Sequence, residues 1–240
     1  MDNIKREFLE FAKLEQPKEA CALVIVQKGK LRLIKCKNLA SDNNHFRLHS
    51  EDWIKAEESG EIVALIHSHP DVSSNPSEAD KISCESTGIP WLIVSLLDNS
   101  WTEIKPTGFV QPLFGRNFYH GVIDCYTLIR DWYRYERNVQ LKNFHRDDNW
   151  WTNGQNLYVN NFKLAGFDEI PRIDGDLDFQ NIQEGDVILM QIQSDVPNHA
   201  GVYIGNSLIA HHLHGRLSSR DVFGGMYQKH ATHILRYQNA

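Results

Sequence analysis

The chain has 240 residues, of which 41% are hydrophobic, and its formal net charge at pH 7 is −6. This length and composition suit one large or two small domains with ordinary apolar cores. Charges of neither sign form a long run, which argues against a nucleic-acid or anionic-membrane surface, and without a run of about 18 apolar residues no transmembrane segment is expected.

The first elements predicted are a helix and a β-hairpin. Residues 3–14 repeat apolar side chains with helical spacing, and Pro17 ends the segment. Two apolar runs, residues 21–26 and 31–36, flank Gly29 and predict the hairpin. The N-terminus lacks the apolar region of a signal peptide, and the four cysteines form no C-x-x-C pair. Both features indicate a reducing compartment rather than a disulfide scaffold.

A buried strand, residues 61–66, is predicted next, and it runs directly into His67 and His69. Residues two apart in a strand point to the same side, so these histidines present two imidazoles to one point. Asp80 can add a carboxylate from the following element. Two nitrogens and one oxygen leave one tetrahedral position open, as in catalytic zinc sites. Such a metal can activate water to attack an amide near neutral pH.

A purely structural interpretation of the same residues is also available. Ser77 and Asp80 fit the start of a helix in which Ser77 is the N-cap. His67 and His69 fit solvated turn residues before Pro70. Asp80 can serve both purposes, because a carboxylate in the first turn suits the helix dipole and can still face a metal. The order of these residues after a buried strand favours the metal site.

The motif H-S-H-P at residues 67–70, followed by S-x-x-D at residues 77–80, resembles that of the JAMM (MPN+) metallopeptidases, a family with an α/β sheet fold. An upstream glutamate belongs to the family's pattern, and Glu19 matches it at the start of an apolar strand. The resemblance implies a zinc ion held by His67, His69 and Asp80. It also implies that Glu19 is the general base and that Ser77 stabilises the oxyanion.

Two further strands, residues 89–96 and 101–105, complete the pattern of a sheet with flanking helices. Prolines and glycines then gather between residues 106 and 115, which is typical of a linker. We therefore expect a first domain of residues 1–108, with a mixed sheet and flanking helices, and a second domain of residues 109–240. The expected fold class is α/β (α+β).

The second domain has a cysteine in a reactive position. Asp124 is the expected N-cap of a helix in which Cys125 occupies the first turn. A helix N-terminus offers free N–H groups and partial positive charge, which favour a thiolate and can stabilise an oxyanion. We therefore expect a nucleophilic Cys125 with a lowered pKa, and rapid alkylation. The alternative is an inert core thiol.

Two strands predicted within residues 198–212 form a hairpin that carries candidate partners for this thiol. A loop centred on Gly205 would set His199 directly opposite His211, and a strict two-residue turn would set it opposite His212. Spacing alone does not choose between them. Either arrangement supplies a base and a group that orients the base, as in cysteine–histidine catalysis. The neighbouring histidines also offer the alternative of a metal site.

The order of these features resembles that of the NlpC-type papain-like cysteine peptidases, which combine a helix with an antiparallel sheet. The matching residues are Asp124-Cys125, Gly185-Asp186, residues 199–206 and His211. The resemblance implies that Cys125 is the nucleophile and His199 the base, and it selects His211 over His212 as the orienting residue. Tyr126 departs from the pattern, because most members have serine there.

A JAMM-type domain followed by an NlpC-type domain is similar to the layout of a family of tail assembly proteins of lambda-like phages. Residues 126–131 and 211–220 look like that family. The resemblance implies a tail-tip component or assembly factor, with other tail-tip proteins as partners and peptidoglycan stem peptides as the substrate of the cysteine site. It places the protein in the host cytoplasm during assembly and at the virion tail tip. The alternative is a structural tail protein whose peptidase folds serve as docking modules.

Overall fold

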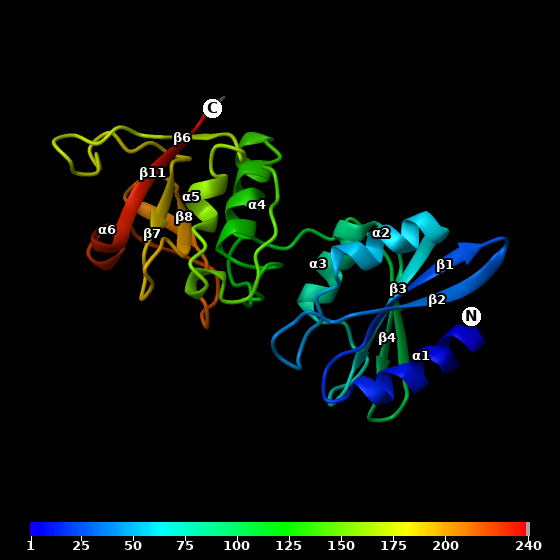
Figure 1. The fold of residues 1–240 in the computed structure, drawn as a ribbon. Coiled ribbons are helices and arrows are strands. Elements are labelled where there is room, and N and C mark those ends of the chain that lie inside the picture. The colour runs from blue at the N-terminus through cyan, green and yellow to red at the C-terminus, as the bar shows by residue number, and fades with distance from the viewer. Residues whose placement is uncertain (239–240) are drawn as a thin grey trace. The chain divides into compact units, whose positions relative to one another are not determined.

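Helices and strands alternate in two separate stretches of the chain. The computed structural model describes residues 1–238, which group into one unit from Met1 to Val110 and a second unit from Gln111 onward (Figure 1). The mixed fold class expected from the sequence is confirmed, because each unit combines helices with a sheet of its own. Within the described residues, no helix is both long enough and apolar enough to cross a membrane.

The first unit is built on a five-stranded sheet with the order β2-β1-β3-β4-β5. Strands β3 and β4 are parallel, and the other neighbouring strands are antiparallel. The elements are α1 (Asp2–Glu15), β1 (Cys21–Gln27), β2 (Lys30–Cys36), α2 (Ser50–Ser59), β3 (Glu61–His69), α3 (Glu78–Thr87), β4 (Trp91–Ser95) and β5 (Trp101–Ile104).

Both faces of this sheet are covered by helices (Figure 1). On one face, Phe8 of α1 packs with Ala22 and Val24 of β1. On the other, Leu23 belongs to a cluster with residues of α2 and α3, among them Cys84. The apolar run of β1 therefore fills two cores at once, which is why it has no polar alternation. β3 lies between β1 and β4, so its side chains are positioned by neighbours on both sides.

The second unit is built on a six-stranded sheet with the order β10-β9-β8-β7-β11-β6, whose strand pairs are antiparallel. The elements are α4 (Cys125–Arg137), a 3-10 helix (Trp150–Thr152), α5 (Leu157–Asn161), β6 (Phe167–Glu169), β7 (Val187–Met190), β8 (His199–Tyr203), β9 (Leu208–His211), β10 (Ser219–Val222), α6 (Met226–His230) and β11 (Ala231–Tyr237).

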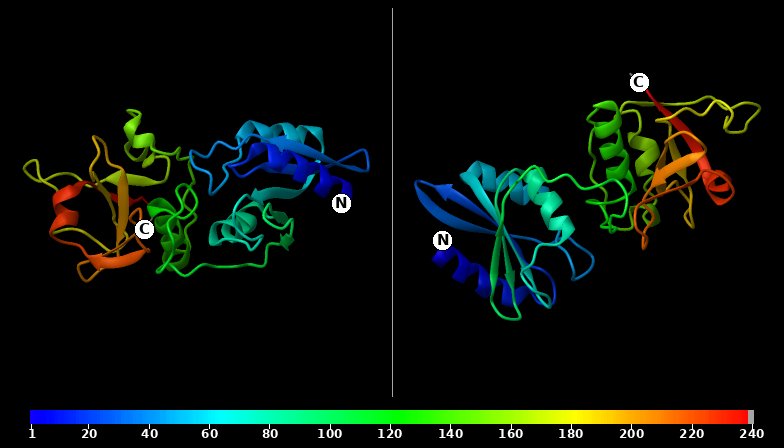
Figure 2. Two further views of the ribbon diagram at one scale, coloured as in Figure 1. Left: turned by 90° about the horizontal axis from the view of Figure 1, so that it is seen from below. Right: turned by 180° about the vertical axis from the view of Figure 1, so that it is seen from behind.

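Helix α4 lies along this sheet, as the views from two sides in Figure 2 show. Its apolar side chains, including Leu128 and Tyr133, share a core with Ala200 and Val202 of β8. The packing of α4 against β8 fixes the start of the helix relative to the start of the strand, which is where the candidate cysteine and histidine lie.

Candidate active sites

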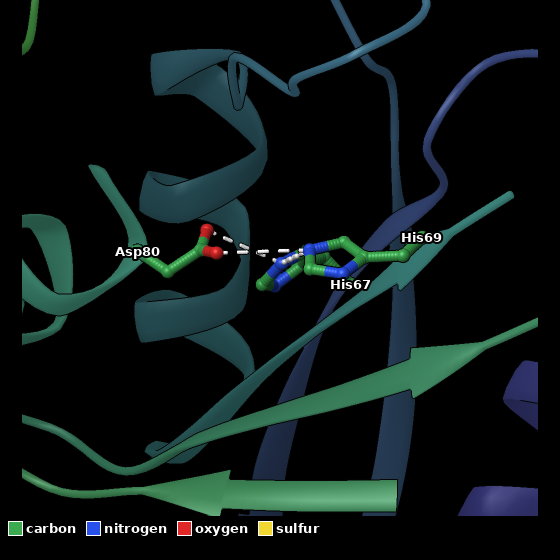
Figure 3. A group of neighbouring side chains, drawn as sticks. All are labelled: His67, His69 and Asp80. Carbon is green, nitrogen blue, oxygen red and sulfur yellow. Dashed lines mark hydrogen bonds and ion pairs between the residues drawn. The ribbon is translucent and has the colours of Figure 1, made fainter. Parts of the chain in front are cut away.

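Three side chains at the end of β3 and the start of α3 converge in the first unit (Figure 3). The Nε2 atoms of His67 and His69 are 3.2 Å apart. His67 Nε2 lies 3.3 Å from one oxygen of Asp80, and His69 Nε2 lies 3.6 Å from the other. All three residues are buried. The two histidines are two positions apart on one strand and therefore point to the same side of the sheet.

The spacing of these atoms fits one metal ion. Two ligand atoms bound to a tetrahedral zinc at about 2.0–2.1 Å lie about 3.3 Å apart, close to the observed separations of 3.2, 3.3 and 3.6 Å. In addition, Nδ1 of His69 lies 2.7 Å from the carbonyl oxygen of Ser73, to which it donates. Because Nδ1 carries the proton of this bond, the lone pair of neutral His69 lies on Nε2, which faces the other two ligands. Histidines that bind a metal are commonly fixed in this way by a hydrogen bond from their other ring nitrogen.

The carboxylate of Asp80 is held by the helix that it begins. Ser77 is the N-cap of α3: its hydroxyl accepts the backbone N–H of Asp80 at 3.1 Å, and Asp80 accepts the backbone N–H of Ser77 at 2.7 Å. This reciprocal pair is a capping box. Both interpretations of Asp80 are thus compatible, because one oxygen can cap the helix while the carboxylate also faces the histidines.

The charges around this cluster are strongly coupled. Burial favours protonation of Asp80, but His67 and His69 outweigh it and hold the pKa of Asp80 well below its usual range. Burial lowers the pKa of His69, yet its bonds to Asp80 and Ser73 raise it overall. Burial raises the pKa of Glu19 to about 8; the charge of His69 opposes this shift, and the negative charge of Asp80 adds to it. The predicted base is therefore buried and electrostatically coupled to His69 and Asp80, two of the three predicted ligands.

In the second unit, Cys125 occupies the first position of α4. Asp124 is the N-cap and accepts the backbone N–H of Thr127 at 2.9 Å. The thiol sulfur lies 3.1 Å from the hydroxyl oxygen of Tyr158, a residue of α5. Among the described residues, this is the side chain with which the thiol forms a hydrogen bond. His199 instead lines the same cavity as Cys125.

The prediction of a lowered cysteine pKa is wrong for this structure. Burial, and then the negative charge of Asp124, raises the pKa of Cys125 to about 11. The hydroxyl of Tyr158, the backbone N–H of Ala200 and the charge of Arg146 oppose that shift without cancelling it. The helix start is present as expected, but the thiol is only 4% exposed, and desolvation of a charge outweighs a helix terminus at such a site.

The histidine hairpin has a register that neither alternative anticipated. Gly201, not His199, lies opposite His211, because three loop residues with positive φ lengthen the turn: Gly205, Asn206 and Ser207. His199 still reaches His211 diagonally, with 3.1 Å between Nε2 of His199 and Nδ1 of His211. Side chains on one face of neighbouring strands can meet in this way. His212 is fully buried, and its ring packs edge-on against Phe118.

Three further polar residues surround the second site, and sequence reasoning missed them. Tyr158 contacts the thiol, Arg146 binds Asp124, and Asp221 lies 3.0 Å from Nε2 of His211. They come from α5, from the loop after α4 and from β10. None belongs to a motif or has a spacing relative to Cys125 that would single it out, so the fold itself had to bring them together.

A cavity of about 390 Å³ opens over the cysteine. Cys125 and His199 both line it. Histidines and aromatic rings supply much of its remaining wall: Phe118, His120, Trp151, His212 and His214. This volume is in the range of pockets that bind small molecules. Burial lowers the pKa of His199 to about 3, and the neighbouring His211 and His212 add to that effect, so the imidazole in this cavity is neutral.

Comparison with known proteins assigns each unit to a class. Residues 2–105 match the family described as prokaryotic homologs of the JAB domain, and residues 114–236 match the NlpC/P60 family. Among solved structures, a JAB1/MPN domain protein from Archaeoglobus fulgidus is similar to part of the chain, with 26% identity over 45% of this chain and 90% of that chain and a TM-score of 0.33. On the two family matches, the chain is a protein with a JAB-type domain followed by an NlpC/P60 domain.

Two relatives match the chain over most of their length. The chain is 38% identical to Tail tip assembly protein K of Escherichia phage N15 over 232 residues, which are 95% of this chain and 91% of the relative. It is 39% identical to Tail tip assembly protein K of Escherichia phage lambda over 188 residues, 78% of this chain and 88% of the relative. The chain belongs to the family of tail tip assembly protein K, as its sequence motifs predicted.

Proposed function

We propose that this tail tip assembly protein carries two hydrolytic sites, a zinc-dependent peptidase or isopeptidase site in the first unit and a cysteine peptidase site in the second. Peptidoglycan stem peptides are the proposed substrate of the cysteine site, and other tail-tip proteins are the proposed partners. The host cytoplasm during assembly, and then the virion tail tip, are the proposed locations. The observation that carries the proposal is the convergence of His67, His69 and Asp80 beside a buried Glu19.

In the first site, His67, His69 and Asp80 would hold the zinc ion. When bound, zinc supplies a Lewis acid that activates water and polarises a carbonyl group. Glu19 acts as the general base in its ionised form, and the pKa of about 8 that burial gives it makes this carboxylate a stronger proton acceptor than an exposed one. The hydroxyl oxygen of Ser77 accepts the N–H of Asp80, so its own hydrogen is available to an oxyanion.

In the second site, the reaction starts from a neutral thiol and a neutral imidazole. The sulfur of Cys125 attacks the carbonyl carbon of the scissile amide while its proton passes to His199. The C–N bond then breaks, and the leaving amine takes the proton from His199. Water hydrolyses the resulting thioester and regenerates the thiol. Free N–H groups at the start of α4 stabilise the oxyanion in both steps.

Digestion of purified peptidoglycan tests this proposal. The polymer is incubated with wild-type protein, with Cys125→Ala or with the His67→Ala, His69→Ala double variant. Mass spectrometry then identifies the released peptides. We expect cleavage within stem peptides that disappears in Cys125→Ala and persists in the double variant. Cys84→Ala serves as the matched control, because Cys84 is a buried free thiol of the other unit.

The result also separates the proposal from a docking role. If wild-type protein releases no peptide and a phage that carries Cys125→Ala and Glu19→Gln still assembles infectious tails, neither catalytic site is needed for assembly. In that case the structural alternative is correct, and the two units act as docking modules.

A further inference from the structure

His211 lies in the middle of a polar line that crosses three neighbouring strands. Ser219 of β10 is the residue directly opposite His211, and Gly201 of β8 is opposite it on the other side. His199 is two positions from Gly201, and Asp221 is two positions from Ser219. Because residues two apart share a face, His199, His211 and Asp221 lie on one face and form a diagonal across the sheet.

The contacts along this diagonal are continuous. Nε2 of His199 is 3.1 Å from Nδ1 of His211, and Nε2 of His211 is 3.0 Å from Oδ2 of Asp221. Tyr227 donates its hydroxyl to the same carboxylate oxygen at 2.8 Å, and its ring packs edge-on against the His211 ring with centroids 4.8 Å apart. The carboxylate of Asp221 therefore accepts two hydrogen bonds, and Nη2 of Arg216 lies 3.9 Å from the same oxygen.

The chemistry of the carboxylate sets the direction of each hydrogen bond. An ionised Asp221 can only accept, so Nε2 of His211 must carry a proton. A neutral His211 then has its lone pair on Nδ1, and that atom must accept from Nε2–H of His199. A neutral His199 is left with its lone pair on Nδ1. Burial keeps both imidazoles neutral. Partial burial raises the pKa of Asp221, but the hydrogen bonds from His211 and Tyr227 outweigh it and keep that pKa below its ordinary value.

We propose that Asp221 is a positioning residue of the cysteine site, which acts through His211 to hold His199 in the tautomer with a basic Nδ1. The proposal rests on the cysteine peptidase function proposed above. It extends the site from cysteine and two histidines to a fourth residue on β10. A fixed tautomer matters because a histidine with its proton on the wrong nitrogen cannot accept the proton of a nucleophile.

Gly201 is the position that permits this diagonal. A Cβ atom there would lie 2.6 Å from Cδ1 of Ile209 and 3.0 Å from Cβ of His211. Any other residue would therefore clash with the side chain of Ile209 and would also crowd the Cβ of His211. The absence of a side chain opposite His211 leaves room for its ring to meet that of His199.

Nitrogen-15 NMR of histidine-labelled full-length protein tests the proposal without requiring turnover. The two residues are assigned from spectra of His199→Gln and His211→Gln. In the wild type at neutral pH, we expect both histidines to carry the proton on Nε2. In Asp221→Ala, we expect the tautomers of both residues to shift toward a mixture. Tyr227→Phe is the matched control, since it removes the other bond to the same carboxylate oxygen and leaves the acceptor in place.

Kinetics of the cleavage of a purified peptidoglycan stem peptide give a second readout. We expect kcat for Asp221→Ala to fall by about tenfold or more, with KM little changed, because the variant weakens proton transfer and not substrate contact. Tyr227→Phe should retain most of its activity.

A wild-type spectrum with the proton on Nδ1 of His199 would overturn the proposal even if Asp221→Ala does not fold. So would unchanged tautomers in a folded Asp221→Ala variant. If the tautomers behave as expected but no protein cleaves peptide, the assignment of Asp221 stands and the proposed peptidase function fails.

Discussion

The guanidinium group of Arg146 contacts both carboxylate oxygens of Asp124, the residue immediately before Cys125. The distances are 2.7 Å from Nε to Oδ2 and 3.3 Å from Nη2 to Oδ1. Asp124 is 1% exposed and Arg146 2% exposed, so the ion pair is buried. The same carboxylate caps α4 through the N–H of Thr127. The pair therefore determines where α4 begins and where the thiol lies.

Loss of one partner should be costly, because it leaves the other charge buried and unpaired. We predict that Arg146→Met lowers the free energy of unfolding by about 3–5 kcal/mol in urea denaturation. Arg137→Met is the matched control: Arg137 pairs with Glu184 at 3.1 Å, but both side chains are exposed, and such pairs contribute about 1 kcal/mol or less. Equal costs for the two variants would show that the buried pair has no special role.

The reactivity of Cys125 should follow a raised pKa. Deprotonation increases as pH rises, so we predict that iodoacetamide alkylation of Cys125 accelerates continuously from pH 7 toward its pKa of about 11, without a plateau near neutrality. The hydroxyl of Tyr158 lowers this pKa, so Tyr158→Phe should raise it and slow alkylation at each pH. Mass mapping of the labelled peptides measures both rates.

Cys84 provides the internal reference for this experiment. Its pKa is also raised to about 11, chiefly by burial, and it belongs to the other unit. Its rate should be the same in wild type and Tyr158→Phe. If the alkylation rate of Cys125 has already reached its maximum at pH 7, the pKa of the thiol is lowered, as its position at the helix start alone suggests.

Ser77 should contribute to stability as well as to the proposed chemistry. Its hydroxyl caps α3, and removal of an N-cap hydroxyl costs about 1 kcal/mol. We predict that Ser77→Ala lowers the free energy of unfolding by that amount. Ser86→Ala should change it by less than about 0.5 kcal/mol, because Ser86 is exposed on the same helix and donates to a carbonyl within it, that of Ile82. Identical stabilities would rule out the cap.

The two sites differ in how much of them the sequence could predict. In the first, the histidines are two residues apart and Asp80 lies in a helix cap, so local patterns suffice to bring the side chains together, and their roles remain predictions. In the second, the register depends on three consecutive residues with positive φ, Gly205, Asn206 and Ser207 at 79°, 51° and 57°, whereas a two-residue type I′ turn uses only two. The length of the turn therefore determines how His199 meets His211, which sequence spacing alone left open.

Burial was the other quantity that local patterns could not supply. The helix start at Cys125 was predictable from Asp124, yet the pKa of the thiol depends on how much protein covers it. That cover comes from Tyr158 and from β8, which are distant in sequence. Arg146 and Asp221 likewise reach the site only through the tertiary fold.

The central claim is that the first unit holds a catalytic metal ion, and the zinc content of purified protein tests it most directly. After incubation with zinc and dialysis, wild-type protein should retain about one ion per chain, and the His67→Ala, His69→Ala double variant should retain none. Glu19→Gln should retain the ion, because Glu19 is the proposed base and not a ligand. No retained zinc in wild type, or equal zinc in wild type and the double variant, would contradict the account.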